Sequence, residues 1–202
     1  MGMPEIPDLS NAFRLDGKVA IVTGAGRGIG AATARVFAQA GADVALVART
    51  KEQLDEVAAD IEGYGRRATV TPLDVNDTAA LAEVVADTVS ALGRLDVVVN
   101  NAGGSMPRPF LETSEGALER AFHFNVTTAF ALSKMATPHL LESEGSIVNI
   151  SSAMGRLRDR GFVAYGTAKA ALAHMTRLMA ADLAPRVRAN AIAVGSVATS
   201  AL

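Results

Sequence analysis

Short apolar runs rich in valine and isoleucine alternate along this chain with longer amphipathic stretches. The apolar runs cover residues 18–23, 43–48, 68–71, 95–100, 146–151 and 187–192. Their apolar character is continuous and not alternating, which predicts strands covered on both faces. Helical patterns fall between them, over residues 28–40, 51–64, 78–92, 114–141 and 164–183. Because strands that alternate with helices form right-handed βαβ crossovers, we expect an α/β fold built on a parallel sheet.

The length and composition of the chain fit a single domain. The chain has 202 residues, of which 50% are hydrophobic and 20% charged, and it contains no tandem repeat or low-complexity linker. A chain of this length can bury one substantial core. We therefore expect a flexible N-terminal arm over residues 1–14 and one domain over residues 15–202.

Charge and residue types argue against several function classes. The net charge of −2 offers no long-range attraction for a polyanion, and the aromatic content of 4% leaves few platforms for base stacking. The chain has no cysteine and three scattered histidines, so we predict no metal site. No apolar run reaches the roughly 20 residues that span a bilayer, and the first residues lack a signal-peptide core. We expect a cytoplasmic protein that binds neither nucleic acid nor membranes.

A glycine-rich turn follows the first predicted strand. Its glycines have the spacing G-x-x-x-G-x-G, which differs from the common G-x-G-x-x-G fingerprint but shares its physics. Glycines permit a tight turn, and the N-terminus of the next helix offers unpaired N–H groups to a pyrophosphate. Such a turn alone is equally compatible with a purely structural role, but its place between a strand and a helix favours a dinucleotide site. The candidate contacts are Gly24, Arg27, Gly28, Ile29 and Gly30.

The end of the second predicted strand bears on the choice of dinucleotide. An acidic residue there would accept hydrogen bonds from the adenosine ribose and repel a 2′-phosphate. This chain has Ala48 followed by Arg49, and Arg27 adds a second cation in the glycine turn. We therefore favour NADP(H) as the cofactor, with NAD(H) possible, while each arginine is also compatible with a solvated surface position.

The ends of the third and fourth predicted strands supply further candidate cofactor contacts. Asp74, next to Val75, can place a carboxylate against an adenine amino group, or it can cap the helix expected from residue 78. Asn100, Ala102 and Gly103 would bring backbone groups near the cofactor, and Asn101 is a further candidate contact, although the glycines here are also compatible with a simple turn.

The pair Tyr165 and Lys169 suggests a phenolic acid/base. Residues four apart on a helix share a face, so the ammonium can lie beside the phenol. A free tyrosine titrates near 10, and a fixed cation favours its ionised form. Ser152 could donate a hydrogen bond to a substrate carbonyl as negative charge develops on its oxygen. Taken singly, each residue also has a structural explanation, whereas together they favour catalysis.

These motifs, taken together, resemble the short-chain dehydrogenase/reductase family over nearly the whole chain. The resemblance rests on Thr23-Gly24-x-x-x-Gly28-x-Gly30, Asp74, Asn100-Asn101-Ala102-Gly103, Asn125, Ser152, Tyr165 and Lys169. It implies a Rossmann-like doubly wound parallel sheet in three α/β/α layers. It also implies hydride transfer between a nicotinamide cofactor and a ketone or secondary alcohol.

The resemblance further implies a catalytic tetrad. Tyr165 would protonate the carbonyl oxygen, Ser152 would orient it, and Lys169 would lower the tyrosine pKa and hold the nicotinamide ribose. Asn125 would support a water-mediated proton relay. From the residues alone, Asn125 is a polar residue in an apolar helical stretch and is equally compatible with a local packing hydrogen bond.

The chain departs from the family pattern near its C-terminus. Val194 stands where the family usually carries proline before Gly195, which predicts a looser turn near the nicotinamide. Val197 and Thr199 are the candidate cofactor contacts of this segment. The chain stops at Leu202, whereas the family continues into substrate-covering helices and a final strand, so we expect the usual C-terminal strand to be absent.

Substrate, assembly and regulation are less constrained by the sequence. Arg156, Arg158 and Arg160 precede Tyr165 and could attract an acidic thioester substrate, or form a solvated loop paired in part with Asp159. The resemblance leaves 3-oxoacyl thioesters, hydroxysteroids and small ketones open as substrates, and it implies a homo-oligomer, either a tetramer or a dimer. The alternative function is a non-catalytic NADP(H)-sensing protein.

Overall fold

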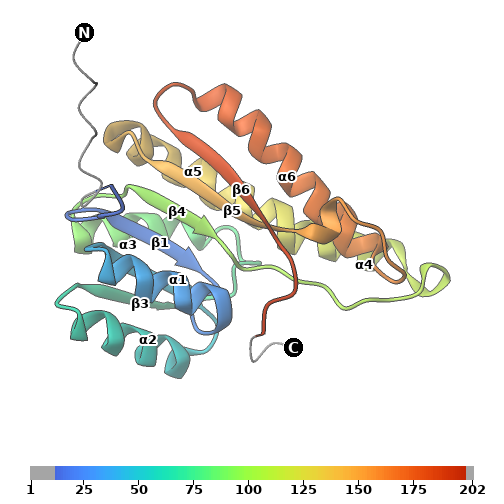
Figure 1. Ribbon diagram of the computed structural model, residues 1–202, viewed down its shortest axis with the longest axis horizontal. Coiled ribbons are helices and arrows are strands. Elements are labelled where there is room, and N and C mark those ends of the chain that lie inside the picture. Colours follow the sequence, from blue (N-terminus) through green and yellow to red (C-terminus); the bar gives the residue numbers. More distant parts are fainter. Residues whose placement is uncertain (1–11, 199–202) are drawn as a thin grey trace, which may run out of the picture.

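Six parallel strands form one sheet in the computed structural model, which describes residues 12–198 (Figure 1). The strands are β1 Val19–Thr23, β2 Asp43–Ala48, β3 Ala68–Pro72, β4 Val97–Asn100, β5 Ser146–Ser152 and β6 Arg188–Val194. Their order is β3-β2-β1-β4-β5-β6, and every neighbouring pair is parallel. The order reverses between β1 and β4, which makes their carboxyl ends the switch point where such sheets bind ligands.

Helices lie on both faces of the sheet, which gives the three-layer Rossmann-like fold that the sequence predicts (Figure 1). One face carries α1 Gly28–Gln39 and α2 Lys51–Gly63, whose core with the sheet includes Leu46, Leu54 and Ile61. The other face carries α3 Leu81–Leu92, α5 Thr128–Ser143 and α6 Val163–Leu183. Short 3₁₀ turns span Phe110–Glu112 and Ala153–Gly155. Within residues 12–198, no helix has the length and apolar character to cross a membrane.

The single helix expected over residues 114–141 is wrong. The segment consists of α4 Glu115–Phe122, a π-helical turn over His123–Thr127, and α5. Asn125 Nδ2 donates to the carbonyl of Ala121 at 2.8 Å, and Thr128 Oγ1 donates to the carbonyl of Phe124 at 2.9 Å. Such side-chain bonds to the i−4 carbonyl compete with the backbone ladder, and a π turn is a common way for a helix to absorb an extra residue.

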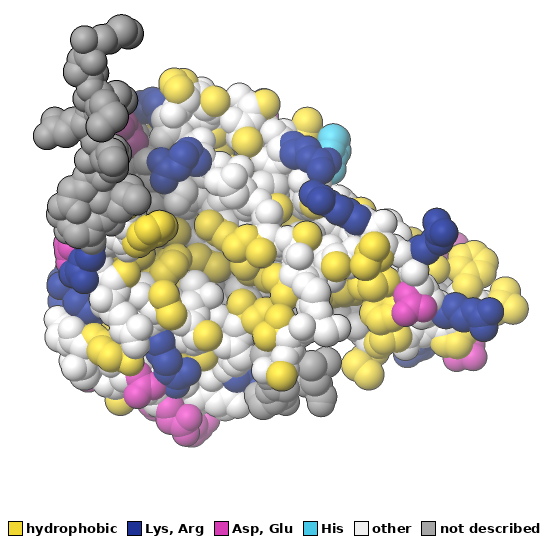
Figure 2. Space-filling view, in the orientation of Figure 1, with side chains coloured by type: hydrophobic (Ala, Val, Ile, Leu, Met, Phe, Trp, Pro, Cys, Tyr) yellow, Lys and Arg dark blue, Asp and Glu magenta, His cyan; other side chains and the backbone are white. Residues whose placement is uncertain are grey.

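The expectation that all strands are covered on both faces fails at the two edges of the sheet, where β3 is only partly buried and β6 is mostly exposed. The residues of β1 are all buried, whereas most of β6 is exposed. β6 is an edge strand, and Ile192 is 51% exposed. Figure 2 shows hydrophobic side chains gathered at the centre of the visible face, and α1 residues with Val197 line an apolar groove. The apolar run of β6 is therefore only partly used in the core formed by residues 12–198.

A buried polar network ties the centre of the sheet to its helices. Asn100 Nδ2 donates to Ser133 Oγ at 2.9 Å and to Asn149 Oδ1 at 2.8 Å. Asn149 Nδ2 in turn donates to Thr176 Oγ1 at 2.8 Å. All four side chains are buried, and the network joins β4, β5, α5 and α6. Because buried polar groups are costly when unpaired, the network specifies how α6 lies relative to the ends of β4 and β5.

Substitution of Asn149 tests the energetic importance of this network. Asn149→Ala is expected to lower the free energy of unfolding by about 1–3 kcal/mol, because it removes two buried hydrogen bonds. Urea denaturation measures the difference. Asn190→Ala is the matched control, since Asn190 lies exposed on the neighbouring strand β6 and is expected to change stability little. Equal effects of the two substitutions would contradict this role of the network.

Candidate active site

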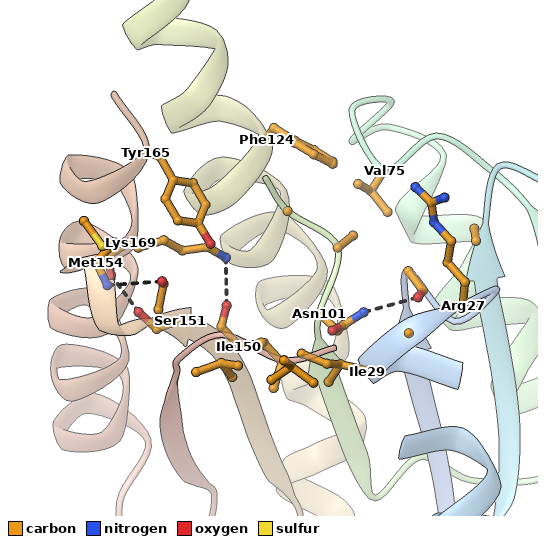
Figure 3. A pocket seen from close by; sticks show the side chains of 18 of the residues that line it. Arg27, Ile29, Val75, Asn101, Phe124, Ile150, Ser151, Met154, Tyr165 and Lys169 are labelled. Carbon is orange, nitrogen blue, oxygen red and sulfur yellow. Dashed lines mark hydrogen bonds between the residues drawn. The ribbon is translucent and has the colours of Figure 1, made fainter. Parts of the chain in front are cut away.

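One pocket opens at the carboxyl ends of the central strands, between the glycine turn and the start of α6 (Figure 3). Most of the residues selected from the sequence line it: Gly24, Arg27, Gly28, Ile29, Arg49, Asp74, Val75, Asn101, Ala102, Gly103, Ser152, Tyr165, Lys169 and Val197. Gly30 and Asn125 are buried and do not line it. Thr199, like most of the arm expected over residues 1–14, lies outside the described residues.

The glycine turn disfavours side chains at its glycine positions. Gly24 and Gly28 have φ angles of +64° and +56°, a conformation that favours glycine. A Cβ on Gly30 would collide with the carbonyl oxygen of Gly24 and lie 2.6 Å from Asn101 Nδ2. The backbone is therefore accessible from the pocket and packed tightly behind it, a geometry that fits a dinucleotide pyrophosphate.

The N-terminus of α1 faces the glycine turn, and no side chain of the helix neutralises its partial positive charge. Its N-cap residue, Arg27, makes no side-chain capping bond, and the first turn contains no acidic residue. The first N–H groups of a helix have no intrahelical partner and carry a partial positive charge. An anionic group in the pocket would therefore find backbone donors at Gly28 and Ile29, both of which line it.

Thr23 and Asn101 hold the turn in place. Thr23 Oγ1 accepts hydrogen bonds from the backbone N–H groups of Asn101 at 3.0 Å and Ala102 at 3.1 Å. Asn101 Nδ2 donates to the carbonyl of Thr23 at 3.0 Å and to that of Gly24 at 3.2 Å, and Figure 3 draws the bond to Gly24. The side chain of Asn101 thus positions the glycine turn. From the sequence, Thr23 has no predicted role beyond its place in the motif. Its position at the end of a buried strand is the feature that points to a structural role.

The end of the pocket beside β2 carries two arginines. Arg27 and Arg49 are exposed and line the pocket, and Ala48 beside Arg49 leaves no carboxylate at the end of β2. Neither arginine makes an ion pair within residues 12–198. This end therefore presents positive charge to a ligand.

Asp74 lines the pocket, and the interpretation of it as a helix cap is wrong. Helix α3 begins at Leu81 and not near residue 78, and the amide of Ala80 bonds to Asp77 Oδ1 at 3.2 Å. Asp74 Oδ1 instead accepts hydrogen bonds from the backbone N–H of Asn76 at 3.0 Å and from its side chain at 2.9 Å. The other role considered for Asp74, a contact with a bound adenine, is compatible with this position.

Tyr165 and Lys169 lie one turn apart near the start of α6 and face the pocket together (Figure 3). The Lys169 Nζ lies 5.7 Å from the centroid of the Tyr165 ring. Lys169 is 3% exposed, and its Nζ donates to the carbonyl oxygen of Ile150 at 2.8 Å. The helical spacing thus brings the amine and the phenol to one wall, as the sequence predicts.

Burial of the Lys169 amine lowers its pKa from 10.5 to about 8. The physical cause is desolvation, which disfavours the charged form. No acidic side chain pairs with Lys169 within residues 12–198. An anion beside Lys169 would therefore be attracted by a cation whose charge water screens poorly.

Close backbone contacts fix α6 against the strand that carries Ser152. A Cβ on Gly155 would lie 2.9 Å from the amide nitrogen of Ala170, and a Cβ on Gly166 would lie 2.9 Å from the carbonyl oxygen of Met154. Ser151 Oγ donates to the carbonyl of Lys169 at 2.9 Å. These contacts let the turn after β5 approach α6 at the level of Tyr165 and Lys169.

Ser152, the last residue of β5, lies at the same wall. It lines the pocket, and its Oγ accepts a hydrogen bond from the backbone N–H of Met154 at 3.2 Å. That bond orients the hydroxyl and uses a lone pair, so the hydroxyl proton can still be donated to a ligand.

Asn125 is fixed by the backbone of the β4 loop. Its Oδ1 accepts from the N–H of Gly104 at 2.9 Å, and its Nδ2 donates to the carbonyl of Gly104 at 2.9 Å. A Cβ on Gly103 would lie 2.6 Å from Asn125 Oδ1 and 3.0 Å from Lys169 Nζ. The packing bond anticipated from the residues is present, and Asn125 places Gly103 against the Lys169 amine. A water relay through Asn125 stays a prediction.

Several pocket residues were missed or misjudged from the sequence. The pocket-lining residues outside the motifs include Gln53, Phe124, Met154, Leu157, Phe162 and Ser196. Val194, noted for replacing proline, is the last residue of β6 and lines the pocket with Gly195. Apolar side chains of loops give no periodic signal, so their place at the pocket depended on the tertiary structure.

The buried amine of Lys169 generates a prediction about stability and pH. Lys169→Met should raise the free energy of unfolding at pH 7 by about 2 kcal/mol, because it removes a burial cost of about 3 kcal/mol and a hydrogen bond worth about 1 kcal/mol. The lysine pKa is lower in the folded protein than in the unfolded chain, so the unfolded chain binds more protons between about pH 8 and 10.5. The wild type should therefore regain stability relative to the variant as pH rises through that window.

Urea denaturation at pH 7, 8.5 and 10 measures this difference. Lys134→Met is the control, because Lys134 is exposed on α5 and its removal should leave the difference independent of pH. A difference between wild type and Lys169→Met that stays constant over this range would contradict the lowered pKa.

Comparisons with known proteins agree with this geometry. The short chain dehydrogenase family matches residues 18–202. An uncharacterized oxidoreductase of Mycobacterium tuberculosis is 58% identical over 192 residues, which cover 94% of this chain and 73% of that protein. The 7alpha-hydroxysteroid dehydrogenase of Escherichia coli is 36% identical over 195 residues, which cover 96% of this chain and 76% of the relative.

Solved structures extend the comparison to the cofactor. A 7 alpha-hydroxysteroid dehydrogenase complexed with NADH and 7-oxo glycochenodeoxycholic acid superposes with a TM-score of 0.91 at 36% identity, over 95% of this chain and 76% of the other. A short chain dehydrogenase of Mycobacterium paratuberculosis bound to NAD has a TM-score of 0.87 at 32% identity, over 92% of this chain and 74% of the other. This chain therefore belongs to the short-chain dehydrogenase/reductase family, whose members are nicotinamide-dependent oxidoreductases that act on alcohols.

Proposed function

We propose that this protein interconverts a ketone and a secondary alcohol with NADP(H), and that Tyr165 is the acid/base. The observation that supports this most is the common wall formed by Tyr165 and Lys169, with the amine 5.7 Å from the ring centroid, in the pocket that also holds the glycine turn. A bound nicotinamide supplies or accepts the hydride. The chain itself has to bind the dinucleotide, orient the carbonyl and move one proton.

Proton transfer is the task of the Tyr165 hydroxyl. In reduction it donates its proton to the carbonyl oxygen, and in oxidation the phenolate takes the alcohol proton back. The Lys169 ammonium stabilises the phenolate because it is buried and poorly screened. The two groups act on each other, so a phenolate at Tyr165 would also favour the protonated form of Lys169.

Ser152 orients the reacting oxygen. Its hydroxyl lines the pocket at the end of β5, and the bond that it accepts from the Met154 amide fixes its direction. A hydrogen bond from this hydroxyl to the carbonyl oxygen strengthens as negative charge develops there. Ser152 and Tyr165 therefore act on one oxygen from two elements, β5 and α6.

Removal of the phenolic hydroxyl tests the proposed acid/base. Tyr165→Phe is expected to lower kcat by roughly 10²–10⁴-fold, the usual contribution of general acid/base catalysis, with little change in cofactor affinity. Nicotinamide absorbance with a panel of ketones measures turnover, and nicotinamide fluorescence measures binding. Tyr64→Phe is the matched control, because the chain has two tyrosines and Tyr64 lies outside the pocket, bonded to Gln39. Normal turnover by Tyr165→Phe would remove Tyr165 from this role.

The preference for NADP(H) rests on the charge at the end of β2. Ala48 offers no carboxylate to repel a 2′-phosphate, and the exposed Arg49 and Arg27 line the same part of the pocket without an ion pair in the described region. The solved relatives described above hold NADH or NAD. The cofactor proposed for this chain therefore differs from the cofactors of those proteins by one group, the 2′-phosphate of NADP(H).

Charge reversal at Arg49 tests the cofactor preference. Arg49→Asp should weaken NADP(H) binding at least about tenfold more than NAD(H) binding, since it replaces attraction by repulsion at the 2′-phosphate. Titration of both dinucleotides against wild type and variant measures the two dissociation constants. Arg177→Asp makes the same charge change on α6 at an exposed position outside the pocket. Equal weakening of both dinucleotides by Arg49→Asp would contradict the role of Arg49.

Assembly into a homo-oligomer also stays a proposal. Large apolar side chains are exposed on the helix pair α4 and α5, where Leu118, Phe122 and Phe130 are 39%, 43% and 47% exposed. Burial of such side chains against a second copy would be favourable. These helices support the expectation of a dimer or tetramer.

A further inference from the structure

The loop between β5 and α6 presents its side chains to two different environments. Its sequence alternates arginine with other residues from Arg156 to Arg160. Leu157 and Asp159 line the pocket, whereas the three arginines do not. All five residues are exposed, and among them one apolar group and one carboxylate border the pocket.

The position of this loop is fixed at both ends. The backbone N–H groups of Arg156 and Leu157 donate to the carbonyl of Ala153 at 2.9 and 2.8 Å. At the other end, the N–H of Arg108 donates to the carbonyl of Gly161 at 2.9 Å. Gly161 has a φ of +83°, a conformation that favours glycine. The backbone between these anchors accordingly follows a fixed path along the pocket.

The carboxylate of Asp159 retains capacity for a ligand. Its Oδ1 accepts a hydrogen bond from the backbone N–H of Arg160 at 2.7 Å. It forms no ion pair with the residues from 12 to 198, although three arginines are close in sequence. An ionised carboxylate has about four lone-pair sites, so most of its accepting capacity is unused.

The position of Asp159 along the pocket indicates which ligand group it meets. Met154, Leu157, Phe162 and Tyr165 line the pocket on the same chain segment as Asp159. The glycine turn and the arginines of the dinucleotide end come from the opposite half of the sheet. Asp159 therefore lies at the end where the carbonyl compound would bind, among apolar side chains that would contact its carbon skeleton.

We propose that Asp159 determines substrate specificity by accepting a hydrogen bond from a second hydroxyl of a neutral, otherwise apolar ketone or alcohol. The same carboxylate repels substrates that carry an anionic group near the reacting carbon. This inference rests on the proposed ketone/alcohol activity and adds the substrate class. It departs from the acidic thioester considered for Arg156, Arg158 and Arg160, because Asp159, although exposed like them, lines the pocket and the three arginines do not.

A matched set of three ketones tests the assignment. Cyclohexanone, 4-hydroxycyclohexanone and 4-oxocyclohexanecarboxylate share one ring and differ only in a hydrogen, a hydroxyl or a carboxylate at one position. For the wild type, kcat/KM is expected to be about tenfold higher for the hydroxyketone than for cyclohexanone, the size of one hydrogen bond to a charged group at an open site. It should be at least about tenfold lower for the carboxylate than for cyclohexanone.

Two substitutions of Asp159 distinguish the effect of its hydrogen-bond-accepting oxygen from the effect of its negative charge. Asp159→Ala should remove the advantage of the hydroxyketone, mainly through KM, and Asp159→Asn should raise kcat/KM for the carboxylate about fivefold or more. Arg158→Gln, on the same loop but outside the pocket lining, is the control and should preserve the wild-type order. Dinucleotide affinity, measured by nicotinamide fluorescence, should be the same in all four proteins.

The outcomes distinguish this inference from the function on which it rests. Turnover of the ketones by wild type, with an order that Asp159→Ala leaves unchanged, would overturn the assignment of Asp159 alone. A wild type that prefers the carboxylate would overturn it as well. Bound dinucleotide without turnover of any of the three ketones would overturn both the proposed activity and this assignment.

Discussion

The site depends on an amine that is held out of water. Lys169 is 3% exposed and has the carbonyl of Ile150 as its hydrogen-bond acceptor. Burial of a cation is unfavourable, and its pKa falls to about 8 as a result. The fold tolerates this because α6 is fixed by close backbone contacts at Gly155 and Gly166. In the proposed reaction the same burial would strengthen the effect of the amine on Tyr165, since a solvated cation would be screened.

The pocket joins two halves with different electrostatic character. The half built from β1 and β2 presents backbone N–H groups and exposed arginines, which suits an anionic dinucleotide. The half built from β5 and α6 presents hydroxyls, apolar side chains and the carboxylate of Asp159. Between the halves lies the switch point, where Thr23 and Asn101 bond the end of β1 to the loop after β4. The sheet order thus assigns the two ligands to separate ends of one cavity.

Much of the fold could be predicted because strand and helix patterns are local. The runs of β1 and β2 are buried at almost every position, and their bounds differ from the predicted ones by at most one residue. The π turn that divides the predicted helix at residues 114–141 could not be predicted, since it depends on where Asn125 finds a backbone partner. The exposure of β6 depends on its edge position, which is a property of the whole sheet.

The candidate site shows the same division between local and tertiary information. Tyr165 and Lys169 could be paired from helical spacing, and the glycines from their place after a strand. The sequence places Asn101 among the cofactor contacts, but it does not predict the bonds of its side chain to the carbonyl groups of Thr23 and Gly24. The roles of Leu157 and Asp159 needed the path of an irregular loop, for which the sequence has no periodic signal.

The π turn at His123–Thr127 makes the length of this segment a constraint in its own right. Each residue of a regular helix advances the chain by about 100°. A deletion inside α5 would therefore rotate the residues on its two sides by that angle relative to each other, whereas the π turn already holds one residue more than a regular helix would. Loss of one residue in the turn would restore a regular helix and leave Leu132 and Leu140 of α5 close to their places in the core. The residues of the turn itself would change direction, and Asn125 would lose its bonds to Gly104. A single-residue deletion in this turn should therefore disturb the loop after β4 more than the core.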